Sequence, residues 1–243
     1  MRRGARFLGS LMIVAGVGLL AWCLLVWLWE DPFTGLYTRY EQRELSRSYD
    51  RLEDAYRPAV PSRPGLSLAA ERRHVAAEAR RFRATARPGS AIGRITIPRL
   101  GLDMVVVNGT DAGSLKRGPG RDGRTYMPGQ GELVYVAGHR TTYSAPFSHI
   151  DRLRRGDRVS VRLPYATFVY RVTGHVVVPA DDLDRLRSRG REVLALQACH
   201  PRFFASHRYI VYARPVELIP RGSSRTYRLG GANAAREATT AAG

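Results

Sequence analysis

Cysteine and lysine are scarce in this chain of 243 residues. The two cysteines, Cys23 and Cys199, are too few for a disulfide-dense scaffold or for a four-cysteine zinc or iron–sulfur site. Lysine occurs once, at Lys116, and the other basic residues are arginines. That bias is typical of GC-rich coding sequences, so the net charge of +18 is weak support for nucleic-acid binding, which we exclude. No acidic cluster has ligand spacing, and we expect no metal and no cofactor.

A long uncharged run extends from Phe7 to Trp29, FLGSLMIVAGVGLLAWCLLVWLW. At 1.5 Å per residue it spans about 34 Å, enough to cross a hydrocarbon core of about 30 Å. The alternative is a secretory signal peptide, whose apolar region is shorter and ends in small residues. This run ends in Trp27-Leu28-Trp29, which is typical of a membrane interface. We therefore predict an uncleaved transmembrane anchor over residues 7–29.

Charges on either side of the run indicate its orientation. Arg2, Arg3 and Arg6 precede it, and Glu30 and Asp31 follow it. The positive-inside rule then predicts a cytoplasmic N-terminus, residues 1–6, and an extracytoplasmic body on a single-pass anchor in the cell membrane. In that topology Cys23 lies in the bilayer and cannot pair with Cys199. The exported thiol of Cys199 is therefore solitary, and it is either reactive or an inert core cysteine.

Residues 30–90 are predicted to form a helical linker. Leu45, Tyr49, Leu52 and Tyr56 recur at helical spacing in a helix over 33–57, which the prolines of 57–65 end. A second helix is expected from an N-cap at Ser67 to about residue 87. We favour a solvated spacer for this linker over an arm that docks on a partner or on lipid.

The remaining chain, 91–219, has the pattern of short strands separated by Gly, Pro and Asp. Runs with strand character cover 92–97, 103–107, 133–137, 159–163, 167–178, 193–199 and 209–216. Seven or eight strands with little helix predict an all-β domain, either an antiparallel barrel or a sandwich. The last segment, 220–243, lacks periodicity and is predicted to be a disordered tail.

Cys199 lies at the end of one strand-like run, and Pro201 ends the pairing just after it. A nucleophilic thiol needs a basic neighbour and a group that stabilises an oxyanion. His139 ends another apolar run and so mirrors Cys199, whereas His200 should point to the opposite face. Arg208 begins the next strand, and a hairpin return would bring it back to the cysteine. The other histidines are weaker candidates: His74 in the linker, His175 inside a strand, and His149 and His207 on spacing alone.

Several of these segments together resemble the sortase family of Gram-positive cell-surface transpeptidases. The cysteine motif of that family, T-L-x-T-C, is matched by Ala195-Leu196-Gln197-Ala198-Cys199, followed by His200-Pro201. Four further features of the family are matched in chain order. The first strand is matched by Ile92–Pro98, the histidine segment by Val136–Thr141, the stretch after it by Ala145 to Leu153 and then Gly156-Asp157, and the arginine strand by Arg208–Val211. The resemblance covers about residues 91–218.

This resemblance implies a sortase β-barrel of about eight strands with short helices. It implies that Cys199 attacks the Thr–Gly bond of an LPxTG-like sorting signal and forms a thioacyl enzyme. His139 would act as general acid and base, and Arg208 would bind the substrate and the oxyanion. The partners would be surface proteins that carry a sorting signal, and the acceptor an amine of a peptidoglycan precursor or a pilin.

This chain departs from the family motif at Ala195 and Ala198, where threonines are usual. The arginine-rich composition, His-Arg-Thr and Cys-His-Pro are similar to the actinobacterial class E type, which is associated with LAxTG-like signals. The motifs of papain-like peptidases and of L,D-transpeptidases do not match around Cys199. A non-enzymatic, membrane-tethered domain that binds the cell wall remains the alternative function.

Overall fold

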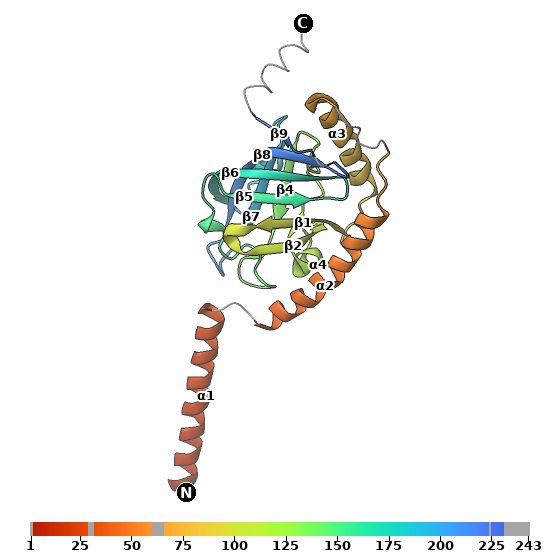
Figure 1. Ribbon diagram of the computed structural model, residues 1–243. Coiled ribbons are helices and arrows are strands. Elements are labelled where there is room, and N and C mark those ends of the chain that lie inside the picture. The colour runs from red at the N-terminus through yellow and green to blue at the C-terminus, as the bar shows by residue number, and fades with distance from the viewer. Residues whose placement is uncertain (1, 29–31, 60–65, 224, 231–243) are drawn as a thin grey trace.

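The computed structural model describes residues 2–28, 32–59, 66–223 and 225–230. Its body is a closed β-barrel, shown in Figure 1. Eight strands follow the order β6-β5-β1-β2-β3-β4-β7-β8, and a further pairing of β6 with β8 closes the ring. The strands are β1 (Ala91–Ile97), β2 (Leu102–Asn108), β3 (Gly120–Arg121), β4 (Leu133–Ala137), β5 (Arg158–Arg162), β6 (Ala166–Pro179), β7 (Val193–His200) and β8 (His207–Pro220).

The predicted fold class is confirmed, and each of the seven expected strand runs forms a strand. The two-residue strands β3 and β9 (Tyr227–Arg228) and the short helix α4 (Ala112–Arg117) were not predicted, because elements this short carry no hydrophobic period. Short 3₁₀ helices complete the barrel: η1 (Pro98–Leu100), η2 (Ile150–Arg152) and η3 (Leu183–Leu186).

Alternation along β7 separates the barrel interior from an outer face. Leu194, Leu196 and Ala198 belong to the main interior cluster, together with Phe168 and Tyr170 of β6. The intervening residues of β7 therefore face outward, since successive side chains of a strand point to opposite sides. Ala195, one of these, packs in a separate outer cluster with Leu133, Tyr135, Val178 and Ile210.

Two long helices pack against the barrel: α2 (Pro32–Ala55) and α3 (Leu68–Thr85). In α2, Leu45 and Tyr49 are buried against Ala91, Val105 and Val107. In α3, which begins at the predicted N-cap Ser67, the residues in the main core are Val75, Ala79 and Phe82. The interpretation of residues 30–90 as a solvated spacer is therefore wrong for the described part. The apolar stripe from Leu45 to Tyr49 was a packing face.

The N-terminal helix carries the candidate membrane span. Helix α1 (Arg2–Leu28) includes one candidate membrane span, Arg6–Leu24, with exposed side chains. The expected end of the anchor at Trp29, the acidic pair Glu30 and Asp31, and residues 60–65 of the proline-rich break lie outside the described residues.

Disorder from residue 220 onward is a prediction that the structure corrects in part. Strand β9 pairs with the end of β8, Tyr227 opposite Leu218, and the Tyr227 ring joins the main core. The wrong boundary arose because one aromatic anchor carries no periodic signal. Residue 224 and residues 231–243 lie outside the described part of the chain.

Candidate active site

The strand register brings the three candidate residues to one end of the barrel. Strand β4 runs parallel to β7 with Ala137 opposite Gln197, and the Gly138 amide donates to the Gln197 carbonyl oxygen at 3.0 Å. The residue after Gly138, His139, is therefore level with Cys199. Strands β7 and β8 are antiparallel, with Cys199 directly opposite Arg208. His139 and Cys199, about 60 positions apart in the sequence, thus lie next to each other at the ends of adjacent strands.

His139, Cys199 and Arg208 line one open cleft of about 270 Å³ on the outer face of the barrel. Ala137, Gln197 and Ile210, from three adjacent strands, also line it. Further lining residues come from the segment before β3 and from the β6–β7 connection: Thr110, Leu115, Leu183 and Leu186. The cleft lies across three strands and is lined by both apolar and charged groups.

Gly138 allows the loop after β4 to pack tightly before His139. A Cβ atom at this position would lie 2.6 Å from the Phe147 ring and 3.1 Å from Pro146. Phe147 is fully buried and its amide donates to the His139 carbonyl oxygen at 3.1 Å. Glycine at position 138 is therefore a packing requirement of the loop that bears His139.

The His139 imidazole is largely buried and lies against an aromatic ring. Its Nε2 has no hydrogen-bond partner among the described residues, and its ring centroid is 5.1 Å from that of Tyr143. Burial, and then the positive charge of Lys116, lower the pKa of His139 below its ordinary value. A neutral ring with an unpartnered nitrogen can exchange a proton with a bound substrate. Tyr143 and Lys116 were not predicted, since no pattern in their own segments marks them.

Arg140 joins the cysteine strand to the histidine loop. Its Nη1 donates to the Cys199 carbonyl oxygen at 3.3 Å and lies 2.8 Å from His200 Nδ1. Its Nη2 forms an ion pair with Asp151 at 2.9 Å. Only 6% of Arg140 is exposed, so this charge is held inside the protein. The sequence singled out its neighbour His139 and not Arg140 itself, because one arginine in an arginine-rich chain is unremarkable by sequence.

Arg208 is held by its own loop at the mouth of the cleft. Its Nη1 donates to the carbonyl oxygens of Ala205, at 2.8 Å, and His207, at 3.1 Å. These bonds fix the orientation of the guanidinium. In the strand pairing, Arg208 lies directly opposite Cys199. Its remaining donors make no hydrogen bond with the described residues and can serve a substrate oxygen.

The other sequence candidates lie elsewhere. His139 is the one described histidine that lines the cleft. The His200 ring lies 5.9 Å from the Tyr209 ring, centroid to centroid, and the His175 ring stacks on the same tyrosine at 5.0 Å. Of the two alanines that replace family threonines, Ala198 faces the interior core and Ala195 lies under the outer cluster. Both side chains are fully buried.

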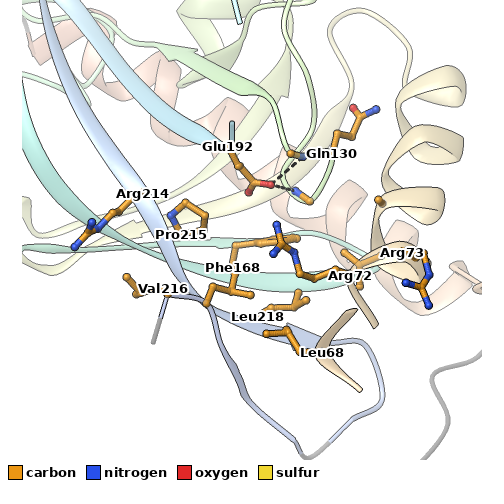
Figure 2. A pocket seen from close by; sticks show the side chains of 16 residues that line it. Leu68, Arg72, Arg73, Gln130, Phe168, Glu192, Arg214, Pro215, Val216 and Leu218 are labelled. Atoms are coloured by element: carbon orange, nitrogen blue, oxygen red, sulfur yellow. Dashed lines mark hydrogen bonds between the residues drawn. The ribbon is translucent and has the colours of Figure 1, made fainter. Parts of the chain in front are cut away.

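A second cavity of about 540 Å³ lies between α3, the loop at 129–131 and β8. Figure 2 shows Glu192 at this cavity, with Arg72 nearby and Arg214 directed away. The Glu192 carboxylate accepts hydrogen bonds from the amides of Gly129, at 2.9 Å, and Gly131, at 3.2 Å, and from the Tyr170 hydroxyl, at 2.7 Å. Burial raises its pKa. This carboxylate secures the loop to the start of β7, at the opposite end of the strand from Cys199.

Comparison with known proteins identifies the family. The model of the "Sortase domain" family matches residues 95–216, half of the chain. Sortase D of Bacillus subtilis is 31% identical over 132 residues, which are 53% of this chain and 65% of that protein. Sortase SrtE1 of Streptomyces coelicolor is 28% identical over 155 residues, 57% of this chain and 44% of that protein. The chain therefore spans less than two thirds of the length of these curated relatives.

A solved structure gives the same fold. Sortase E1 from Streptomyces coelicolor, determined with a tripeptide in the active site, superimposes with a TM-score of 0.52 at 28% identity. The match covers 58% of this chain and 97% of that one. The expected resemblance to sortases is confirmed, and the similarity to the class E type agrees with two of these matches.

Proposed function

This chain belongs to the sortase family, and we propose that it is a membrane-anchored cysteine transpeptidase that joins a signal-bearing surface protein to an amine. The observation that carries the proposal is the shared cleft of His139, Cys199 and Arg208, which strand register holds level with one another. Together a thiol, an imidazole and a guanidinium supply the nucleophile, the acid–base group and the oxyanion partner for acyl transfer through a thioester.

In the first half of the reaction, the Cys199 thiol gives its proton to His139, and the resulting thiolate attacks the threonine carbonyl carbon of a sorting signal. Arg208 stabilises the negative oxygen of the tetrahedral intermediate. The C–N bond to glycine then breaks as His139 gives its proton to the leaving amine. The products are a thioester on Cys199 and a free glycine amine.

In the second half, an incoming amine attacks the thioester carbonyl and loses its proton to His139. The C–S bond breaks, the Cys199 thiolate is restored, and a new amide remains. Without an acceptor, water can take the place of the amine and the reaction ends as hydrolysis. A peptidoglycan precursor or a pilin lysine is the acceptor we propose in the cell.

The proposed signal is LPxTG-like or LAxTG-like. The similarity to sortase E1 supports a peptide in this cleft, because that relative was solved with a tripeptide in its active site. For localisation we propose a single-pass protein in the cell membrane, with the N-terminus in the cytoplasm and the barrel outside. The candidate span Arg6–Leu24 supports this arrangement.

The test is peptide cleavage by the full-length chain in detergent micelles, with and without triglycine as acceptor. LPxTG and LAxTG fluorogenic peptides are compared in parallel. Cys199→Ala should abolish turnover, and His139→Ala should lower it by about 10²- to 10⁴-fold while circular dichroism shows a folded barrel. Mass spectrometry should detect the thioester on wild-type protein only. Turnover retained by Cys199→Ala would overturn the cysteine mechanism, and no turnover by wild type would favour a non-enzymatic domain that binds the cell wall.

A further inference from the structure

The loop that follows His139 has an unfavourable backbone conformation. Three consecutive residues have positive φ: Tyr143 at 54°, Ser144 at 56° and Ala145 at 34°. For residues with a side chain, the left-handed region costs about 1–2 kcal/mol each. Such a run persists only where contacts from elsewhere hold it. The segment that supplies those contacts therefore helps to determine the conformation of the loop.

Helix α2 supplies contacts to this loop at its first turns. The Tyr143 amide donates to Thr34 Oγ1 at 2.9 Å, and the Ser144 hydroxyl donates to the Gly35 carbonyl oxygen at 3.1 Å. The ring of Tyr37 meets the ring of Tyr143 edge-on, with centroids 6.4 Å apart. The two segments are more than 100 residues apart in sequence, so these are tertiary contacts.

The same helix is itself fastened to the barrel. Thr38 is fully buried and its hydroxyl donates to the Lys116 carbonyl oxygen at 2.9 Å. The Gln42 side chain bonds both main-chain groups of Val105, accepting at 2.8 Å and donating at 3.0 Å. Glu41 forms an ion pair with Arg117 at 2.7 Å. The first turns of α2 are thus a rigid support and not a tether.

On its other side, Tyr143 contacts the histidine. Its ring lies 5.1 Å from that of His139, tilted by 37°. The Lys116 Nζ atom is 5.8 Å from the Tyr143 centroid, so the aromatic ring lies close to both the ammonium and the imidazole. One aromatic side chain therefore connects α2 with the proposed general acid.

We propose that the first turns of α2, Thr34 to Thr38, support the loop after β4, and that Tyr143 is a positioning residue that sets the orientation and hydration of the His139 ring. This inference rests on the proposed function, because it assigns the contact a role through the chemistry of His139. It also assigns the segment between the membrane span and the barrel a part in catalysis.

The physical effect is on the protonation of His139. Loss of the Tyr143 ring would admit water to the imidazole, weaken the effect of burial and raise the pKa of His139 toward its ordinary value. Asp122 and Arg124 pair with each other at 2.7 Å, so their charges largely cancel near the site. The charged and titratable groups that line the cleft with His139 are Asp122, Arg124, Tyr135, Asp182, Cys199 and Arg208. Lys116, Tyr143 and Tyr37 face it from α4, the loop and α2.

The experiment uses the full-length chain with two disruptive variants. Tyr143→Ala removes the ring, and Thr34→Val removes the hydroxyl that accepts from the Tyr143 amide. Tyr143→Phe is the conservative control, since the ring remains. Tyr40→Ala is the matched control on α2, because this tyrosine is 61% exposed and makes none of the loop contacts described above. Thermal unfolding of each variant checks that the barrel remains folded.

Two measurements are made on each variant. The first is the pH titration of the His139 ring by NMR, assigned with His139→Gln, which needs no turnover. The second is the pH profile of kcat and KM for sorting-signal cleavage. We expect Tyr143→Ala and Thr34→Val to raise the pKa of His139 and to lower kcat by about 10- to 100-fold, with KM little changed. Tyr143→Phe and Tyr40→Ala should match wild type in both measurements.

The possible failures are distinguishable. If wild type cleaves the peptides but Tyr143→Ala and Thr34→Val change neither the His139 titration nor kcat, the inference is overturned and the proposed function stands. If kcat falls equally in Tyr40→Ala, or falls without a shift of the titration, α2 has only a general structural role and the inference is again overturned. If wild type shows no Cys199-dependent turnover, the proposed function fails and the catalytic role of Tyr143 fails with it.

Discussion

The Arg140 guanidinium donates a hydrogen bond of 3.3 Å to the main-chain carbonyl oxygen of Cys199. The residue next to the proposed general acid therefore holds the strand end that bears the proposed nucleophile. Arg140 also stands over the Tyr209 ring, with its Cζ 5.7 Å from the centroid, and pairs with Asp151 at 2.9 Å. The buried Arg140 side chain, which follows β4, thus contacts the end of β7 and the start of β8.

Replacing this cation tests how strongly it couples the two strand ends. Arg140→Gln would leave buried acceptors without a donor and should lower the free energy of unfolding by about 1–3 kcal/mol. Activity should fall by more than the loss of folded protein explains, because Arg140 no longer fixes the spacing of His139 and Cys199. Urea denaturation followed by circular dichroism and peptide cleavage measure the two effects. Arg47→Gln, at an exposed ion pair with Glu44, is the control and should change stability by less than about 0.5 kcal/mol.

The docking of α2 on the barrel can be tested with two leucines of that helix. Leu45 is 2% exposed and Leu36 is 67% exposed. Leu45→Ala should therefore lower the free energy of unfolding by about 2–5 kcal/mol, whereas Leu36→Ala leaves no cavity. Chemical denaturation of both variants gives the comparison. Equal effects would contradict the packing of α2 and restore the spacer interpretation.

The depressed pKa of His139 predicts a pH dependence of stability. The unfolded histidine takes up a proton near its ordinary pKa of about 6.5, whereas the folded one does so only at lower pH. Protons then favour the unfolded chain, so this residue lowers the free energy of unfolding as pH falls below about 6.5, until the folded ring is also protonated. His139→Gln should be more stable relative to wild type at about pH 5 than at about pH 8.

Denaturation curves of wild type and His139→Gln at both pH values measure this difference. His200 also has a lowered pKa, chiefly through burial, but it contributes equally to both proteins and cancels to first order. A stability difference that is the same at the two pH values would mean that His139 is not held in its neutral form.

The two cysteines should behave differently. Cys23 lies in the candidate membrane span, and Cys199 is half-buried in the cleft. Cys23→Ala should retain full peptide cleavage, since it is far from the proposed chemistry along the chain. A methanethiosulfonate reagent added to Cys23→Ala should then modify Cys199 alone and stop turnover. A large loss of activity in Cys23→Ala itself, before any reagent, would contradict the proposed topology.

The local sequence pattern was sufficient for much of the fold. Short apolar runs predicted the strands that became β4 and β7, and the Gly and Pro positions predicted their ends. The stripe of Leu45 and Tyr49 predicted a helix, but its burial was missed because an apolar stripe does not say which surface covers it. Strand β9 was missed for a related reason, since Tyr227 is a single aromatic anchor in a polar segment.

By itself, the sequence determined the strand-rich body, the candidate span, and the positions of His139, Cys199 and Arg208 at strand ends. Those features depend on neighbouring residues, whose spacing is visible along the chain. Only the tertiary structure decided that β4 and β7 lie parallel with His139 level with Cys199, that Arg140 turns inward to hold both, and that α2 reaches Tyr143. These relationships depend on contacts between segments about 60 to 110 residues apart, and no local spacing encodes which distant segments pair.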